Sequence, residues 1–286
     1  GTLVDEALAR RLGQLGNLSP SLSIEGLRAR TDARRGAGVF EQVVVAARHL
    51  RAAGGLFGLS LTATRENAGE ILSEALVEQF FDGLGAGYAW VFHYMPIGRA
   101  FTLELMLTPQ QRVALWRRMR RLVDERQIFL ADFWNGATAT SGCVAAGRPG
   151  GYFYVDWNGN LSPCVFMPYS PVNVRELFAR GQTLEDAWEL PFFAALRDWQ
   201  RGYGYREPGQ PHAGVRNWLR PCPIRDHHAE FMQIVRRHQP RPNDPDAAAA
   251  LADPAYHAGL ERFDRELAEL SDPLWAEHVR GNGRGH

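Results

Sequence analysis

Apolar residues in the first half of the chain follow two alternating spacings. Four short runs are typical of strands, at residues 18–24, 56–63, 88–94 and 128–131. Longer stretches have apolar residues at helical spacing, at residues 3–16, 38–53, 68–84 and 109–126. Thr108 and Pro109 supply an N-cap and a first-turn proline for the last of these helices. This alternation predicts an α/β fold with a parallel sheet or a barrel of βα units.

The number of these units limits what the first half of the chain can form. Three complete βα units are too few to close a barrel, which needs about eight strands. The first strand would also be an exposed edge, which a complete protein would cover. We therefore expect the C-terminal half of a partial TIM-type barrel, with strands missing upstream of Gly1.

The second half of the chain has a different pattern. Two apolar runs, at 152–155 and 161–165, flank a strong turn signal at 156–160 and predict a β-hairpin. Helices are expected at residues 183–189, 191–200 and 226–238, a loop at 201–221, a linker at 239–248 and a helical tail at 249–280. The chain should thus contain a half barrel over 1–135, a small α+β domain over 136–240 and a helical extension over 241–286.

Composition narrows the classes of partner. With 45% hydrophobic residues, the 286-residue chain can bury a sizeable core. Lys+Arg and Asp+Glu are both 32, so no net field attracts nucleic acid or anionic lipid. No apolar run approaches the roughly 20 residues that span a bilayer, and no signal peptide opens the chain. These features predict a cytoplasmic protein with neither nucleic-acid nor membrane partners.

The three cysteines are the main candidates for chemistry. Cys143, Cys164 and Cys222 are odd in number and widely scattered, which argues against a disulfide framework. Zinc sites usually contain closer pairs such as Cys-x2-Cys, which the sequence lacks. Thiolates in rigid turns are also ligands of iron–sulfur clusters. The residues alone leave inert buried thiols and a metal or cluster site as equal alternatives.

The flanking residues add a resemblance. The run Cys143-x15-Gly159-x4-Cys164, with its Asp156–Cys164 hairpin, resembles the SPASM/twitch domains at the C-terminus of many radical SAM enzymes. The resemblance implies an auxiliary 4Fe–4S cluster bound by Cys143, Cys164 and Cys222. Those domains contain more cysteines, so the fourth iron would either have a ligand other than cysteine or stay open to substrate. The nearby candidates are Asp226, His227 and His228, although the favoured roles are a helix N-cap for Asp226 and surface positions for the histidines.

The upstream region resembles the radical SAM core itself. The segments that carry this resemblance occur in the expected order: Gly1–Leu3, Ser23–Gly26, Thr31–Gly36, Leu61–Asn67 and His93–Arg99. Each is weak alone, and the ordered set with the cysteine hairpin is specific. The resemblance covers about residues 1–235.

The resemblance also implies an S-adenosylmethionine (AdoMet) pocket. Ser23 and Glu25 would bind the ribose or carboxylate, and Arg35 the carboxylate. Thr62, Thr64 and Asn67 would line the ribose, while Tyr94, Met95 and Pro96 would cover the adenine. Each residue also has an ordinary structural interpretation. Ser23 and Thr62 could be polar positions of a strand, Glu25 could lie in a surface turn, Arg35 could form a salt bridge in a loop, and Met95 could pack in the core. The segment Asp132–Asn135 could reach a substrate, or simply form an aromatic turn.

The implied reaction is hydrogen abstraction from a peptide or small-molecule substrate by a 5′-deoxyadenosyl radical. A flavodoxin or ferredoxin would be the electron donor. The Cys-x3-Cys-x2-Cys loop and the Gly-Gly-Glu segment of the family are absent from this sequence. We therefore expect a fragment of a radical SAM enzyme that is inactive alone, whose catalytic 4Fe–4S cluster belongs to the complete protein. The alternative is a non-catalytic peptide- or nucleotide-binding module with a structural iron–sulfur or zinc site.

Overall fold

The computed structural model describes residues 1–205 and 216–282. The chain divides into two compact units. Unit 1 comprises Gly1–Tyr94 and Leu105–Phe133, and unit 2 comprises Met95–Glu104 and Trp134–His286. The region expected as a separate helical extension, 241–286, thus belongs to unit 2. The assignment of the three regions to a half barrel, a cluster domain and an extension stays a prediction.

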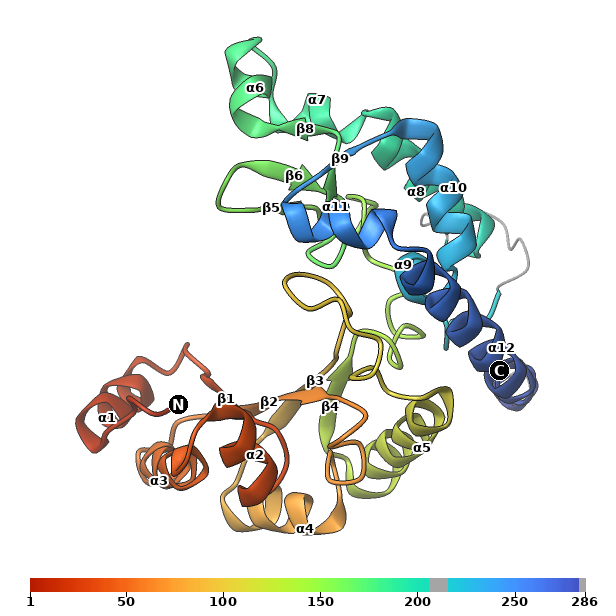
Figure 1. Ribbon diagram of the computed structural model, residues 1–286. Coiled ribbons are helices and arrows are strands. Elements are labelled where there is room, and N and C mark those ends of the chain that lie inside the picture. The colour runs from red at the N-terminus through yellow and green to blue at the C-terminus, as the bar shows by residue number, and fades with distance from the viewer. Residues whose placement is uncertain (206–215, 283–286) are drawn as a thin grey trace. The chain divides into compact units, whose positions relative to one another are not determined.

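Unit 1 is built on a parallel four-stranded sheet (Figure 1). Its strands are β1 (Ser21–Ile24), β2 (Gly58–Ala63), β3 (Tyr88–His93) and β4 (Phe129–Asp132). The strand order β1-β2-β3-β4 follows the sequence, and every neighbouring pair is parallel. All four predicted strands and the α/β class are therefore confirmed.

Helices of unit 1 lie along one face of this sheet (Figure 1). They are α1 (Glu6–Leu15), α2 (Arg28–Arg35), α3 (Val39–Ala52), α4 (Glu74–Val77), its π-helical continuation η1 (Glu78–Gly83), and α5 (Pro109–Arg126). Leu59 and Val91 of the sheet are fully buried in one core with Leu50 of α3 and Phe80 of η1. The predicted start of α5 is confirmed, because Thr108 and Gln111 form a capping box.

Two details of unit 1 differ from the sequence prediction. Residues 31–36 were expected to form a loop, yet α2 covers most of them. This helix has almost no apolar periodicity, and its order comes from tertiary contacts such as the buried Thr31. The helix expected at 68–84 begins only after Ser73, because Leu72 adopts a left-handed backbone conformation with φ of 56°.

Unit 2 contains the predicted hairpin. Strands β5 (Tyr154–Val155) and β6 (Asn160–Ser162) are antiparallel, and β8 (Val172–Asn173) pairs with β6. Asp156 Oδ1 closes the turn by accepting from the backbone N–H groups of Asn158 and Asn160, and Gly159 takes the positive φ that the turn requires. A second small sheet joins β7 (Tyr169–Ser170) to β9 (Arg241–Pro242), so the segment predicted as a linker is partly ordered by pairing.

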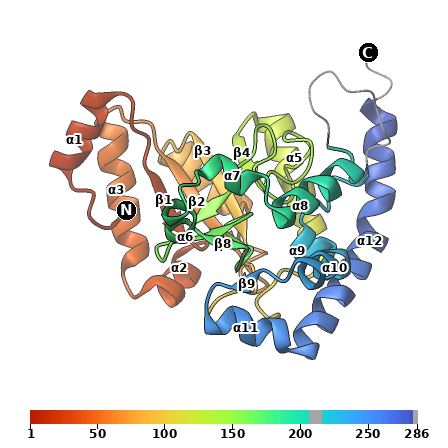
Figure 2. The same cartoon turned by 90° about the horizontal axis from the view of Figure 1, so that it is seen from above.

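The remaining elements of unit 2 are helices. They are α6 (Val174–Ala179), α7 (Leu184–Trp188), α8 (Pro191–Gly202), α9 (Pro223–Asp226), α10 (His228–His238), α11 (Pro245–Ala252) and α12 (Pro254–Asn282). Helix α12 packs against α9 and α10 (Figure 2). No described helix is long and apolar enough to cross a membrane.

Several predictions for unit 2 need correction or fall outside the described residues. The surface positions expected for His227 and His228 are wrong, because both side chains are buried. Helix α6 was not expected, and the helix predicted at 226–238 is two helices that meet at His227. Asp226 is the last residue of α9 and not an N-cap, because Pro223 starts a separate turn before it. The middle of the loop predicted at 201–221 cannot be compared, since residues 206–215 lie outside the described residues.

Candidate functional site

The carboxyl ends of the parallel strands gather ionisable and polar side chains at one edge of the sheet in unit 1. Glu25 follows β1, Thr64 follows β2, His93 ends β3 and Asp132 ends β4. All four are buried. Ligands of open parallel sheets bind outside the carboxyl ends of the strands. This edge is therefore the candidate binding site of unit 1.

Glu25 is held in a buried ion-pair network. Its Oε1 accepts from Arg35 Nη2 at 2.6 Å and from Arg35 Nε at 2.9 Å, while Oε2 accepts from Arg34 Nη1 at 2.9 Å. The residue is only 1% exposed, so two guanidinium groups compensate its buried charge. Two predicted site residues, Glu25 and Arg35, are thus brought together, but as partners of each other. Their roles toward AdoMet stay predictions.

Asn67 connects the ends of β1 and β2. Its Nδ2 donates to the carbonyl oxygens of Glu25 and Thr62, both at 2.9 Å. Its Oδ1 accepts from the backbone N–H of Thr64 at 2.7 Å. With 4% of its surface exposed, Asn67 uses both ends of its amide within the protein. Three predicted ribose-side residues therefore lie together, with Asn67 fixing the backbone beside Thr62 and Thr64.

The other residues predicted to contact AdoMet lie within β1 or directly after β3. Ser23 lies within β1, half-buried, opposite Ser60. The backbone N–H of Tyr94 donates to the carbonyl of Ala63 at 2.9 Å. This bond extends the pairing of β2 and β3 by one residue. Met95 and Pro96 are buried and belong to unit 2.

A buried histidine–aspartate pair at this edge was not predicted. His93 Nε2 lies 2.8 Å from Asp132 Oδ2, and both side chains are completely enclosed. The sequence analysis noted Asp132 only in a segment that could reach a substrate, and His93 only within a motif. The signal was available, because adjacent parallel strands that both end in an ionisable residue place those residues at the same edge.

The three cysteines of unit 2 are free thiols, and Cys143 acts electrostatically on Cys164 and on Cys222. Burial raises the pKa of Cys164 to about 12, and the nearby Cys143 adds to this shift. Burial also raises the pKa of Cys222 to about 12, with smaller contributions that include Asp226 and Cys143. The pKa of Cys143 is likewise raised by burial. Cys143 is thus the member that acts on both of the others, and all three thiols are protonated at neutral pH while no metal binds them.

Hydrogen-bond donors lie at the sulfur of Cys164 and at the backbone carbonyl of Cys143. The Tyr152 hydroxyl lies 3.1 Å from Cys164 Sγ, and the backbone N–H of Phe166 donates to the same sulfur at 3.4 Å. Arg148 Nε donates to the carbonyl of Cys143 at 2.6 Å, and Gln200 Nε2 donates to that carbonyl at 3.2 Å. Such donors hold the cysteine loops in place and stabilise a sulfur that becomes a thiolate.

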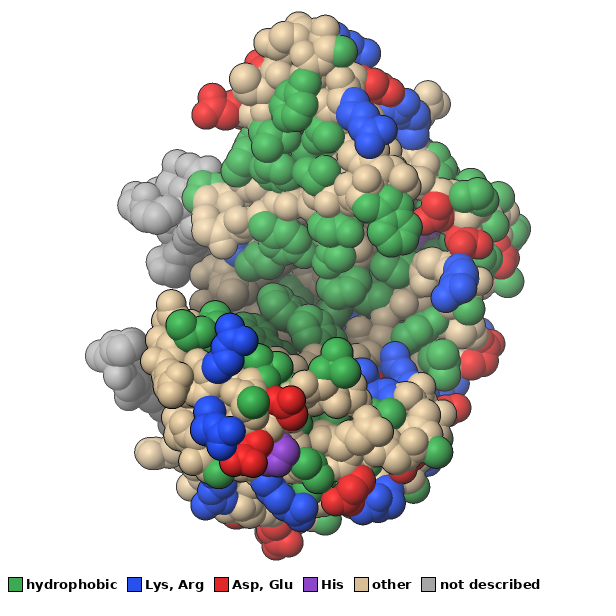
Figure 3. Space-filling model, turned by 90° about the vertical axis from the view of Figure 1, so that its left-hand side faces the viewer, with side chains coloured by type: hydrophobic (Ala, Val, Ile, Leu, Met, Phe, Trp, Pro, Cys, Tyr) green, Lys and Arg blue, Asp and Glu red, His purple; other side chains and the backbone are tan. Residues whose placement is uncertain are grey.

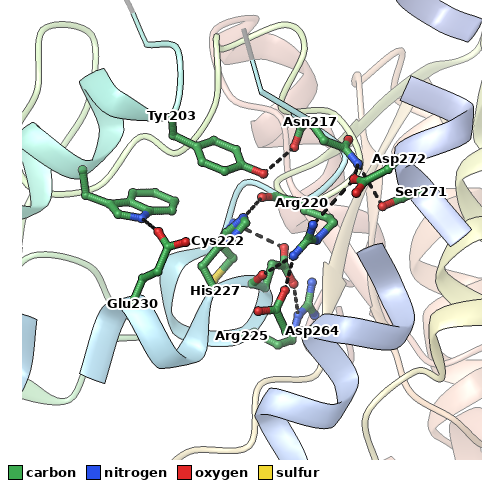
Figure 4. Close-up of polar contacts among 12 residues, drawn as sticks. Tyr203, Asn217, Arg220, Cys222, Arg225, His227, Glu230, Asp264, Ser271 and Asp272 are labelled. Carbon is green, nitrogen blue, oxygen red and sulfur yellow. Dashed lines mark hydrogen bonds and ion pairs between the residues drawn. The ribbon is translucent and has the colours of Figure 1, made fainter. Parts of the chain in front are cut away.

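Cys222 lies in a dense polar network (Figure 4). Its backbone N–H donates to Asp226 Oδ2 at 3.2 Å, and Arg225 Nε donates to Asp226 Oδ1 at 3.0 Å. His227 Nε2 lies 2.8 Å from the carbonyl oxygen of Arg220. Arg220 in turn forms an ion pair with Asp264 of α12. Asp226 therefore faces the Cys222 loop, whereas His227 is engaged by Arg220.

The fit of these residues to a metal depends on the kind of group. Among residues 1–205 and 216–282, no three or more His, Cys, Asp or Glu side chains form a group that could hold a metal ion. The ligands of a 4Fe–4S cluster bind different iron atoms and are therefore farther apart than the ligands of one ion. Three thiols of unit 2, with Cys143 acting electrostatically on Cys164 and Cys222, match the ligand type of a cluster.

Comparison with known proteins gives a likeness of fold. No protein-family model matches the sequence, and a search of the curated proteins found no match. The structure of native anSMEcpe with bound AdoMet and Cp18Cys peptide has a TM-score of 0.50 at 15% identity, covering 84% of this chain and 73% of that chain. The structure of Streptococcus suis SuiB has a TM-score of 0.48 at 14% identity, covering 68% of this chain and 49% of SuiB. At this identity, the likeness to anSMEcpe concerns the fold.

Proposed function

We propose that this chain supplies part of the AdoMet site and the auxiliary-cluster site of a radical SAM enzyme. The observation that carries the proposal is the placement of the sequence motifs. The segments that resemble the radical SAM core end β1, β2 and β3 at the carboxyl edge of a parallel sheet. A structure of similar fold, anSMEcpe, contains bound AdoMet, which supports an AdoMet site in this chain.

Arg35 can contribute to AdoMet binding without leaving Glu25. A guanidinium has five N–H donors, and the bonds to Glu25 use only Nε and Nη2. Nη1 can then donate to the carboxylate of AdoMet. The side chain of Arg35 is 34% exposed, so a ligand can reach it, whereas the Glu25 carboxylate is enclosed. In this proposal Glu25 orients Arg35, and Arg35 contacts AdoMet.

The backbone around Asn67 would form the ribose side of the same pocket. Asn67 fixes the carbonyls of Glu25 and Thr62 and the N–H of Thr64. Ser23, Thr62 and Thr64 then present hydroxyl groups that can bond to ribose. Tyr94, Met95 and Pro96 would cover the adenine, as the motif resemblance implies.

Cys143, Cys164 and Cys222 would hold an auxiliary 4Fe–4S cluster. When bound, such a cluster supplies a site for electron transfer or for direct substrate contact. The protein's own residues prepare the thiolates. Tyr152 and the Phe166 N–H donate to Cys164, and Arg148 and Arg225 place positive charge beside Cys143 and Cys222. Since the sequence has no Cys-x3-Cys-x2-Cys loop, we infer that this chain alone does not cleave AdoMet.

A peptide is the substrate class that we favour. The anSMEcpe structure of similar fold contains the Cp18Cys peptide. Within unit 2, the upper part of Figure 3, hydrophobic side chains also gather on the face that is shown. In unit 2 the hairpin exposes Trp157 at 92% and Val155 at 38% of their surfaces, which suits contact with an apolar segment of peptide. A small-molecule substrate is the alternative to a peptide. A flavodoxin or ferredoxin is the proposed electron donor.

The AdoMet site can be tested by binding to the purified chain. Titration of AdoMet, followed by amide hydrogen exchange, should protect residues around Glu25 and Asn67. Arg35→Lys should weaken binding about tenfold, because the charge-assisted hydrogen bond from Nη1 to the AdoMet carboxylate is worth about 1–2 kcal/mol. The matched control is Arg28→Lys, whose exposed side chain pairs with Glu41 on the outer surface. Saturable binding that is unaffected by Arg35→Lys, or no binding at millimolar AdoMet, would contradict the proposed pocket.

A further inference from the structure

Two histidines of unit 2 are in direct contact, and both ring nitrogens of His228 face partners within the protein. His228 is the first residue of α10 and is 1% exposed, and His257 lies in the first turn of α12. His228 Nε2 lies 2.8 Å from His257 Nδ1, a hydrogen-bond distance. Their ring centroids are 5.1 Å apart, with 27° between the ring planes. The contact joins two helices that pack together within unit 2.

The outer nitrogen of each ring faces a backbone carbonyl oxygen. His228 Nδ1 lies 2.7 Å from the oxygen of Ile224, and His257 Nε2 lies 2.8 Å from the oxygen of Leu251. A carbonyl oxygen can only accept a hydrogen bond. Both outer nitrogens must therefore carry a hydrogen, which fixes the tautomer of each ring if it is neutral.

Counting hydrogens then determines the charge of the pair. A neutral imidazole carries one N–H, and in both rings that hydrogen is on the outer nitrogen. Two neutral rings would therefore place two lone pairs against each other across the 2.8 Å contact. One additional proton converts this repulsion into a charge-assisted hydrogen bond. We propose that His228 and His257 form a binding site for a single shared proton, so that the folded pair carries one positive charge.

The surroundings indicate that His228 is the ring of the pair that stays neutral. Burial lowers the pKa of His228 to about 4, and the positive charges of His257 and Arg236 contribute to this shift. His228 therefore accepts through Nε2 as a neutral ring. The carbonyl of Leu251 belongs to the last turn of α11, where the helix dipole is negative and favours a cation. The first turn of α12 opposes this effect, and Asp253 caps that turn by accepting from Ala255 and Tyr256 N–H groups.

The shared proton would hold the start of α12 against α10. Other bonds fix later parts of α12, such as Asn217 Nδ2 to Ser271 Oγ at 2.9 Å and the Arg220–Asp264 ion pair. Loss of the proton at high pH leaves two facing lone pairs, and a second added proton at low pH leaves two facing N–H groups. Either change removes the hydrogen bond, so the α10–α12 contact is strongest between these limits.

Nitrogen NMR of the full chain with 15N-labelled histidine tests this proposal directly. At pH 7 the pair should show three protonated nitrogens and one unprotonated nitrogen, His228 Nε2. An isolated histidine with a pKa of about 6.5 is only about one quarter protonated at that pH. Two neutral rings at pH 7, each with one protonated nitrogen, would overturn the proposal.

A pair of variants separates the shared proton from ordinary titration. In His228→Gln, the protonated fraction of His257 at pH 7 should fall to that of an isolated histidine. The control is His238→Gln, at the end of the same helix, which should leave the spectrum of the pair unchanged. An unchanged protonated fraction of His257 in His228→Gln would also overturn the proposal. If that variant does not fold, the spectrum of the unmodified chain still decides the question.

Discussion

Arg35 binds the buried carboxylate of Glu25 through two of its nitrogens, Nη2 at 2.6 Å and Nε at 2.9 Å from Oε1. Because the carboxylate is enclosed, its removal leaves two arginines without their shared partner. We predict that Glu25→Gln lowers the free energy of unfolding by about 2 kcal/mol. Urea denaturation measures this change. Glu41→Gln is the matched control, since its pairs with Arg28 and Arg48 are exposed and worth about 0–1 kcal/mol. Equal effects of the two substitutions would contradict the buried network.

Asn67 should be the side chain that maintains the end of the sheet. Its amide makes three buried hydrogen bonds, to Glu25, Thr62 and Thr64. Asn67→Ala leaves a backbone N–H and two carbonyl groups without this partner, and should cost about 2–3 kcal/mol of stability. Amide exchange should quicken at residues 25 and 64 specifically. Asn17→Ala, at an exposed position of the same unit, should change neither quantity. Unaltered exchange at the sheet edge in Asn67→Ala would argue against this role.

The lowered pKa of His228 predicts how stability depends on pH. Its pKa is about 4 in the folded chain and 6.5 in the unfolded chain, so the unfolded chain binds more protons between these values. The free energy of unfolding should therefore fall as pH drops from about 6.5 to about 4, by up to about 3 kcal/mol from this residue. His228→Gln should reduce the difference in stability between pH 7 and pH 4.5. The same difference in both proteins would contradict the assignment.

The hydroxyl of Tyr152 should raise the midpoint potential of the proposed cluster. Donation to Cys164 Sγ at 3.1 Å reduces the electron density that this ligand gives to iron. Tyr152→Phe should still allow a cluster to form, but with a lower midpoint potential in a redox titration followed by electron paramagnetic resonance. Tyr154→Phe, on the neighbouring exposed strand, should leave the potential unchanged. A cluster with the same potential in Tyr152→Phe would exclude the tuning role while leaving the cluster itself in place.

Local sequence signals predicted the elements that depend on local chemistry. The four strands follow from short apolar runs, the start of α5 from Thr108 and Pro109, and the hairpin from the Asp156–Asn160 turn. Helix α2 escaped prediction because tertiary contacts order a segment without apolar periodicity. The break at His227 escaped because a proline three residues before Asp226 begins a separate short helix.

Pairings between distant residues were much harder to predict. Glu25, Arg35, Thr62 and Asn67 were selected through a resemblance, yet nothing local showed that Arg35 binds Glu25 or that Asn67 bridges two strands. The His93–Asp132 and His228–His257 pairs join residues 39 and 29 positions apart. The motif pattern could suggest which residues matter, whereas packing of the strands and helices determines which of them meet.

The most direct test of the proposed function is anaerobic reconstitution of the chain with iron and sulfide. We predict about four iron and four sulfide per chain, with absorbance at about 400 nm. Cys143→Ala should abolish this uptake, because Cys143 is the thiol that acts on both of the others. Tight zinc binding without iron uptake, or a full cluster in Cys143→Ala, would contradict a cluster bound by Cys143, Cys164 and Cys222.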